Sequence, residues 1–264
     1  MGERAPRAHV LAPGGPGGPL VVLAHGLEDG WTGWRAVAAH WPAGARLVAL
    51  DLPWRAGNDY RWRQRDPGWW LAEGLAPLGA VPDLLVGHSF GANAALELLC
   101  AATEPPRAAA LLCPLYRVPG APLGEHAEGR SRAAFARLFR EGVLARLGER
   151  AASMEEELRD RVVALAAGQV GAPGFRAAFD QYHASAALPL GRVTTPTLVL
   201  GGGANPTLSR TEAAALADGM PGGSLVFHDT YDHFCHIRRA HDVVAQLVRL
   251  VEPAPAAPRD GGPR

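Results

Sequence analysis

Six short runs of apolar residues recur along the chain, and each run is apolar throughout rather than alternating with polar residues. They cover residues 20–24, 46–50, 83–86, 108–113, 197–200 and 224–227. Strands that are buried on both faces of a parallel sheet have this uninterrupted pattern. Segments with helical spacing of apolar residues lie between the runs, at residues 92–102, 211–217 and 240–251. The alternation predicts an α/β fold, a mostly parallel central sheet flanked by helices.

One long interval, between residues 113 and 194, contains no convincing strand pattern. It holds arginine-studded helical segments instead, at residues 130–147, 154–167 and 175–187. We interpret this interval as an inserted helical lid. The predicted organisation is a flexible N-terminal segment with one edge strand (1–19), a core (20–113 and 193–252), a helical lid (114–192) and a disordered tail (253–264).

A serine flanked by glycines lies between the third apolar run and the helical segment that follows it. The residues Gly87-His88-Ser89-Phe90-Gly91 form a G-x-S-x-G pattern in the strand–turn–helix context that this motif requires. The turn is so tight that a Cβ at either glycine would collide with the neighbouring strand or helix. The pattern predicts Ser89 as a nucleophile at the carboxyl edge of the sheet, and the alternative is an ordinary Gly-rich turn.

A serine nucleophile needs a general base within hydrogen-bond reach. His233 is the best candidate because it follows the last apolar run across a short loop and precedes the final helical segment. The alternative for His233 is a histidine on a surface loop. His228, His233 and His236 are also close in sequence, but their spacing matches no standard zinc pattern, so we predict no metal ligand.

The backbone after the first apolar run offers a second functional element. His25-Gly26-Leu27 ends that run, and the N–H groups of Leu27 and Phe90 are the candidate oxyanion hole. Backbone donors would stabilise negative charge that develops on a carbonyl oxygen, whichever side chains those residues carry.

Composition narrows the function further. The 26 basic residues equal the 26 acidic ones, so binding driven by nucleic-acid phosphates is not expected. All the basic residues are arginine; without lysine, Schiff-base and Ser–Lys chemistry are excluded, and the bias fits a GC-rich bacterial genome. No apolar run reaches the ~18 residues of a membrane span, and no secretory signal is visible. Three cysteines, an odd number, fit reduced thiols and a cytoplasmic location.

These landmarks together resemble the α/β-hydrolase family over about residues 21–251. The matching motifs are Leu23-Ala24-His25-Gly26-Leu27, Ala49-Leu50-Asp51-Leu52-Pro53, Gly87-His88-Ser89-Phe90-Gly91 and Asp232-His233-Phe234. The resemblance implies an α/β-hydrolase fold, a Ser–acid–His triad, and hydrolysis or transfer of an ester, thioester, amide or similar group. The family usually has two strands before the His-Gly strand, whereas this chain has room for about one.

The family's acid usually follows strand seven, but the matching turn here carries no carboxylate. Asn205 holds the position. One explanation places the acid after the strand that the family numbers six, as in some relatives. In this chain the corresponding turn, which begins at Cys113, also lacks a carboxylate. The second, which we prefer, makes Asn205 the partner that orients His233. The third is that hydrolysis has been lost and a binding scaffold remains.

A tryptophan- and arginine-rich stretch, residues 54–70, also departs from the family pattern. It either rigidifies a surface loop or lets Trp31, Trp34 and Trp54 wall an aromatic pocket, with His25 and His88 nearby. Its arginines are either solvated structural charges, which we favour, or a surface for an anionic carrier.

The sequence as a whole predicts a serine hydrolase that acts on a small-molecule ester or thioester, free or carrier-bound, through an acyl-enzyme. No cofactor is predicted. The alternatives are a non-hydrolytic acyltransferase or lyase, or a catalytically impaired ligand-binding member of the same fold.

Overall fold

The computed structural model describes residues 5–122 and 127–252. The predicted disordered tail at residues 253–264 therefore lies outside the described residues, and so do the first four residues of the predicted N-terminal segment.

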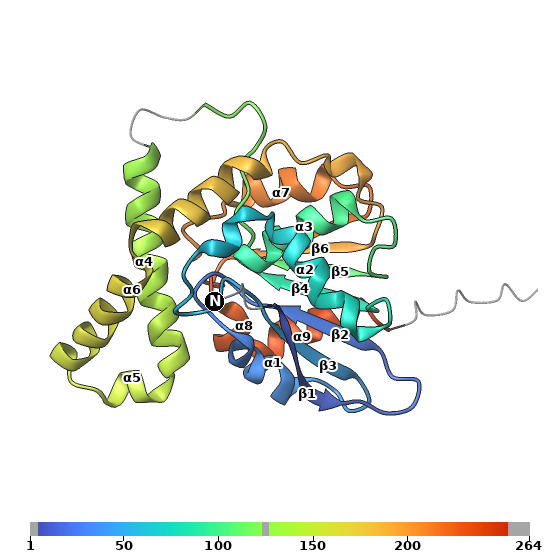
Figure 1. Cartoon of the computed structure of the whole chain (residues 1–264), viewed down its shortest axis with the longest axis horizontal. Coiled ribbons are helices and arrows are strands. Elements are labelled where there is room, and N and C mark those ends of the chain that lie inside the picture. Colours follow the sequence, from blue (N-terminus) through green and yellow to red (C-terminus); the bar gives the residue numbers. More distant parts are fainter. Residues whose placement is uncertain (1–4, 123–126, 253–264) are drawn as a thin grey trace, which may run out of the picture.

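Within the described chain, seven strands form a single sheet in the order β1-β3-β2-β4-β5-β6-β7 (Figure 1). Every neighbouring pair is parallel except β1 and β3, which are antiparallel. A mostly parallel sheet with β1 alone before the central strand β2 matches the trimmed architecture that the sequence predicts. The strands are β1 (Arg7–Pro13), β2 (Leu20–Ala24), β3 (Arg46–Asp51), β4 (Leu84–His88), β5 (Ala109–Leu112), β6 (Thr197–Gly202) and β7 (Gly223–His228).

Helices cover both faces of the sheet, and each face has its own cluster of buried side chains. On one face lie α2 (Pro67–Leu75), α3 (Phe90–Ala101) and α7 (Arg210–Asp218). The other face is covered by α1 (Arg35–His40), α8 (Cys235–Arg238) and α9 (Ala240–Val248). All residues of β2, β4, β5 and β6 are buried, as their uninterrupted apolar runs predict, whereas the edge strand β7 is only partly buried.

Short 3-10 helices occupy several connections. They are η1 (Trp31–Trp34), η2 (Arg61–Gln64), η3 (Ala76–Leu78) and η4 (Leu190–Arg192). The first two lie in the tryptophan-rich connections that follow β2 and β3, close to the carboxyl edge of the sheet.

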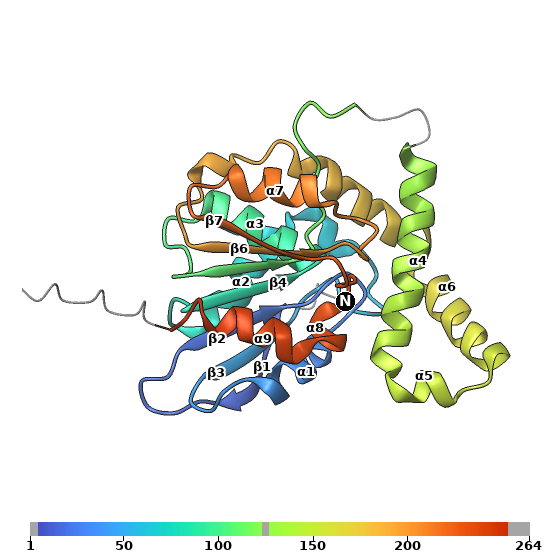
Figure 2. The ribbon, with the colours of Figure 1, turned by 180° about the vertical axis from the view of Figure 1, so that it is seen from behind.

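Within the described residues, three α-helices lie between β5 and β6 and stand beside the sheet (Figures 1 and 2). We refer to α4 (Ala127–Leu147), α5 (Glu149–Ser153) and α6 (Glu156–Ser185) as the helical insert. The backbone of α6 leaves helical geometry at Gly171, where φ is 53°, within the gap between the predicted helical segments 154–167 and 175–187. By length and composition α6 is apolar enough to cross a membrane, but this break divides it and its C-terminal part packs against α3.

Candidate active site

Ser89 occupies a sharp turn between β4 and α3. Its backbone adopts φ 52° and ψ −119°, a strained conformation for a residue other than glycine. A Cβ on Gly87 would lie 2.6 Å from Cα of Ala92, and one on Gly91 would collide with the carbonyl oxygens of Ala24 and His25. Both glycines are therefore required by close approach of the backbone, as the sequence pattern predicts.

The loop after β2 lies directly beside this turn. A Cβ on Gly26 would be 3.3 Å from Cβ of Ser89, so the loop packs closely against the Ser89 side chain. Among the residues that the structure describes, the Leu27 N–H donates no hydrogen bond. Phe90 is the first residue of α3, where an N–H has no intrahelical acceptor. Two backbone donors are therefore free beside the nucleophile position.

His233 lies in the loop between β7 and α8 and is almost completely buried. Its Nδ1 is 3.1 Å from Oδ1 of Asn205, which lies in the turn after β6. Burial holds the pKa of His233 well below its usual value, and the neighbouring His88 lowers it further. His233 is therefore neutral at physiological pH, the form that can accept a proton.

The orientation of the Asn205 amide is fixed by Thr207. The Thr207 N–H donates to Oδ1 at 3.2 Å, and the Thr207 hydroxyl lies 2.9 Å from the same oxygen. A backbone N–H can only donate, so the atom it meets must be the amide oxygen. The Nδ1 of His233 must then carry its proton toward Oδ1, which leaves a lone pair on Nε2. An asparagine in this orientation selects the tautomer that a general base needs.

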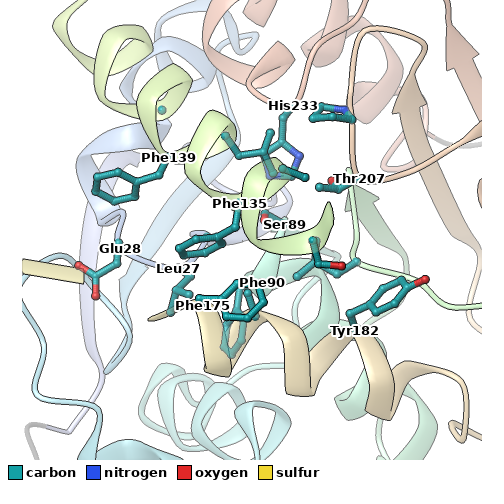
Figure 3. A pocket seen from close by; sticks show the side chains of 18 of the residues that line it. Leu27, Glu28, Ser89, Phe90, Phe135, Phe139, Phe175, Tyr182, Thr207 and His233 are labelled. Carbon is teal, nitrogen blue, oxygen red and sulfur yellow. The ribbon is translucent and has the colours of Figure 1, made fainter. Parts of the chain in front are cut away.

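Ser89 and His233 line the same cavity, although no hydrogen bond joins the Ser89 hydroxyl to the imidazole within residues 5–122 and 127–252 (Figure 3). Hydrogen bonds between catalytic groups commonly tighten only when substrate binds. The arrangement is therefore compatible with proton transfer from serine to histidine.

None of the carboxylates near His233 replaces the missing acid in the described structure. Asp232 accepts from the Phe234 N–H at 2.9 Å and pairs with Arg238 at 2.7 Å. Asp229 pairs with Arg210 on the surface.

The turn after β5, the other position considered for the acid, begins at Cys113. Cys113 is a buried thiol whose pKa is raised by a hydrogen bond with Cys235 and by burial. Among these described groups, the Asn205 amide is the one that contacts the imidazole.

The cavity has a volume of about 380 Å³ and is strongly aromatic. Six of the seven phenylalanines of the chain line it. Two lie one turn apart on α4 and two lie one turn apart on α6, so the helical insert forms much of the wall (Figure 3). The six are Phe90, Phe135, Phe139, Phe175, Phe179 and Phe234.

The three tryptophans predicted to line the pocket do not line the cavity. Trp34 and Trp54 are fully buried in the two cores, and Trp31 stacks on His9 at 4.3 Å. Of the residues predicted near the pocket, His88 lines the cavity, while His25 binds the Leu52 N–H through Nε2 at 3.0 Å. Trp54 packs beneath the cavity against Phe90, whereas Trp34 is buried in the core on the opposite face of the sheet. The phenylalanines at spacing i, i+4 in the insert were the signal for the real wall.

Asp29, His88 and His236 form a buried group whose potential ligand atoms lie within 4.8 Å of one another. The guanidinium of Arg146, on α4, lies 3.6 Å from the Asp29 carboxylate. Arg146 therefore already supplies positive charge beside Asp29, which opposes the binding of a cation there. Burial lowers the pKa of His88 to about 4 and also that of His236, so both imidazoles are neutral. We assign no metal to this group.

A protein family and several known proteins are similar to this chain. A family model described as "Alpha/beta hydrolase family" matches residues 21–247. Epoxide hydrolase 3 of Xenopus tropicalis is 32% identical over 100 residues, which cover 36% of this chain and 27% of that protein. Epoxide hydrolase B of Mycobacterium tuberculosis is 34% identical over 102 residues, which cover 35% of this chain and 28% of that protein. The matched stretch is thus little more than a quarter of these curated relatives.

Solved structures extend the similarity over nearly the whole fold. The enol-lactonase from Burkholderia xenovorans LB400 has a TM-score of 0.63 at 17% identity, covering 93% of this chain and 96% of that one. A hydrolase from Pseudomonas aeruginosa PA01 has a TM-score of 0.63 at 16% identity, covering 94% of each chain. At such identities the likeness establishes the fold alone.

Proposed function

The chain belongs to the alpha/beta hydrolase family, and from this we propose that it is a serine hydrolase that cleaves a small apolar ester or thioester through an acyl-enzyme. One observation supports this above the others. A strained serine, a neutral histidine held in the tautomer with a free Nε2, and two unoccupied backbone donors all meet at one cavity.

In the proposed first step, Nε2 of His233 accepts the hydroxyl proton of Ser89 while the serine oxygen attacks the carbonyl carbon. The N–H groups of Leu27 and Phe90 donate to the oxygen that becomes negative. The tetrahedral adduct then collapses, and the imidazolium gives its proton to the departing alcohol or thiol. An acyl group is left on Ser89.

In the second step, water attacks the acyl carbon and gives a proton to His233. The new tetrahedral adduct expels the serine oxygen, which takes that proton back. A carboxylic acid and the free enzyme result. If an alcohol, amine or thiol acceptor replaces water, the same steps describe the alternative, acyl transfer.

A serine nucleophile does not suit the epoxide hydrolysis for which the relatives are named. Opening an epoxide with the Ser89 oxygen would form a serine ether, which water does not cleave under mild conditions. A carboxylate nucleophile would instead form an ester that water can hydrolyse. Serine at the nucleophile position therefore favours acyl chemistry.

The aromatic lining of the cavity indicates the class of substrate. A cavity of this volume lined by phenylalanine favours an apolar or aromatic acyl group over a short polar one. Asn205 cannot stabilise the imidazolium by charge, so slow turnover is expected. In a serine protease the corresponding change from Asp to Asn lowers kcat by ~10⁴.

The test is labelling of the folded protein with a fluorophosphonate probe, together with hydrolysis of p-nitrophenyl esters of increasing acyl length. Ser89→Ala should abolish both reactions. Ser131→Ala is the matched control because Ser131 also lines the cavity, from α4, and it should react like the wild type. Failure of the folded wild type to react, or labelling that survives in Ser89→Ala, would rule out Ser89 as the nucleophile. Faster release of p-nitrophenol with an added alcohol or amine than with water alone would identify a transferase.

A further inference from the structure

The stretch after β3, which departs from the family pattern from residue 54 onward, holds the backbone of the oxyanion loop (residues 25–29). Four hydrogen bonds connect residues 52–56 to this loop. The Leu52 N–H donates to Nε2 of His25 at 3.0 Å, and Nε1–H of Trp54 donates to the His25 carbonyl at 2.9 Å. The Glu28 N–H donates to the Trp54 carbonyl at 2.9 Å, and the Ala56 N–H donates to the Asp29 carbonyl at 2.8 Å.

The side chain of Glu28 is bound by the same stretch. Its carboxylate accepts from the Gly57 N–H at 3.1 Å, from Nδ2 of Asn58 at 2.6 Å and from the Tyr60 hydroxyl at 2.6 Å. Glu28 is only 5% exposed, so it depends on these three donors for the bonds that water would otherwise make. Charge-assisted bonds of this length are among the stronger ones in proteins.

Both polar atoms of the Asn58 side chain make further hydrogen bonds within the stretch. Its Oδ1 accepts from the Tyr60 N–H and from Nε1–H of Trp62, each at 2.9 Å. Its Nδ2 also donates to the Arg55 carbonyl at 2.9 Å. Because each of these atoms is engaged, the donors that meet Glu28 have fixed positions.

Glu28 also has an unfavourable backbone conformation. Its φ is 55°, in the left-handed region that residues other than glycine adopt at a cost. It directly follows Leu27, the residue whose N–H is a proposed oxyanion donor. Strain of this kind persists only where surrounding contacts over-determine the conformation.

We propose that Glu28 is a positioning residue that sets the oxyanion hole. Its carboxylate, held by Gly57, Asn58 and Tyr60, keeps the loop in the strained conformation that presents the Leu27 N–H beside Ser89. This inference rests on the proposed serine-hydrolase function. It also gives the stretch after β3 a role, because that stretch supplies the donors.

The variants Glu28→Gln and Tyr60→Phe test this, with Arg63→Ala as the control. Gln cannot accept from all three donors, and Phe removes one donor from a residue that does not line the cavity. Arg63 lies in the same stretch, but its side chain pairs with Asp180 on α6 instead of donating to Glu28. The measurements are kcat and KM for a p-nitrophenyl ester and the affinity for a trifluoromethyl ketone, whose adduct with Ser89 carries the oxyanion.

We expect Glu28→Gln to lower kcat by ~10²-fold, the scale of losing one oxyanion donor, with KM changed less than threefold. Tyr60→Phe should lower kcat roughly five-fold, the effect of one lost hydrogen bond. The double variant should be no worse than Glu28→Gln alone, because both act through the same carboxylate. Affinity for the ketone should fall in parallel with kcat, and Arg63→Ala should change kcat less than twofold.

A second readout separates this inference from the proposed function. In ¹⁵N-labelled protein, the Leu27 amide should give one sharp signal in the wild type and in Arg63→Ala, and a broadened or multiple signal in Glu28→Gln. A wild type without Ser89-dependent turnover would contradict the proposed function, while the amide signal would still report on the loop. An unchanged Leu27 signal and unchanged kcat in folded Glu28→Gln would overturn the positioning role. A kcat of Glu28→Gln equal to that of Arg63→Ala would also overturn the positioning role.

Discussion

The side-chain oxygen of Asn205 lies 3.1 Å from Nδ1 of His233, where the family usually has a carboxylate. Thr207 fixes the amide by donating to the same oxygen. The amide can therefore orient the imidazole and choose its tautomer, but it contributes no negative charge to stabilise the imidazolium. A carboxylate would both orient the imidazole and stabilise its positive charge, whereas Asn205 provides the orientation alone.

Replacing Asn205 with aspartate should restore the missing charge with almost no change in shape. Its Oδ1 can keep the bonds to His233 and Thr207. Its second oxygen would replace Nδ2, a buried group without a hydrogen-bond partner among the described residues. We expect Asn205→Asp to raise kcat for a p-nitrophenyl ester by roughly tenfold or more, since the reverse change costs ~10⁴ in a serine protease. Steady-state kinetics on the purified variant measure this.

Asn205→Leu is the control for this substitution, because it keeps a similar volume and removes the acceptor. It should lower kcat below the wild-type value. If Asn205→Asp were folded but slower than wild type, the amide itself would be needed for the natural reaction. Equal rates in Asn205→Leu and the wild type would remove Asn205 from the mechanism.

The pH dependence of kcat/KM should reveal the environment of His233. The general base must be deprotonated, and burial holds its pKa well below the usual value, with His88 lowering it further. Activity should therefore persist as the pH falls through 6.5 and decline only in more acidic buffer. In Asn205→Asp the nearby carboxylate favours the imidazolium, so the acidic limb should move toward neutral pH by about one unit or more. An acidic limb near pH 6.5 in the wild type would contradict the lowered pKa of the buried His233.

The phenylalanine lining should set the preference for acyl length. Phe135 and Phe175 contact each other edge to face across α4 and α6, with ring centroids 5.9 Å apart. Replacing either with alanine should lower kcat/KM for octanoyl or aromatic esters by roughly tenfold, about 1.4 kcal/mol of lost apolar contact. The acetate ester should change less than threefold.

Phe227→Ala is the matched control because Phe227 is the seventh phenylalanine and lies on β7, outside the cavity lining. It should leave the ratio of octanoyl to acetyl turnover unchanged. If Phe135→Ala and Phe227→Ala altered that ratio equally, the insert would not be part of the acyl site.

Local patterns were sufficient to predict the parts of the molecule that depend on chain order. Strand–turn–helix order places Ser89 at the carboxyl edge, and the loops after the last two strands, β6 and β7, place Asn205 and His233 near it. In the structure these positions do meet at one edge. Parallel strands impose this convergence on any sequence that folds this way.

The pocket wall could not be predicted in the same way, because it depends on how the helical insert packs. Trp54 is fully buried and packs edge to face on Phe90 at 5.3 Å, so it supports the site from below. The role of Glu28 was equally hidden. Its three donors come from a stretch about 30 residues away, and nothing in the local pattern pairs them.

The buried histidines should make the fold sensitive to mild acid. Burial lowers the pKa values of His25, His88, His233 and His236 in the folded chain, whereas unfolding returns each toward its usual 6.5. Between pH 6.5 and about 4 these four histidines therefore bind more protons in the unfolded chain than in the folded chain. Their contribution to the free energy of unfolding is fully present above pH 6.5 and is lost as the pH falls toward their pKa values in the folded chain. For His88, with a pKa of about 4, the loss amounts to about 3 kcal/mol.

Urea unfolding at a series of pH values from 7.5 to 4.5 measures this effect. The free energy of unfolding should fall with a slope that corresponds to between two and four protons, roughly 3–5 kcal/mol per pH unit at its steepest. His236→Phe removes one buried imidazole and should reduce the slope by about one proton. His241→Gln is the control, since its side chain is 80% exposed, and should leave the slope unchanged. A flat profile across this range would show that the folded chain takes up as many protons as the unfolded chain, which would contradict the lowered pKa values of the buried histidines.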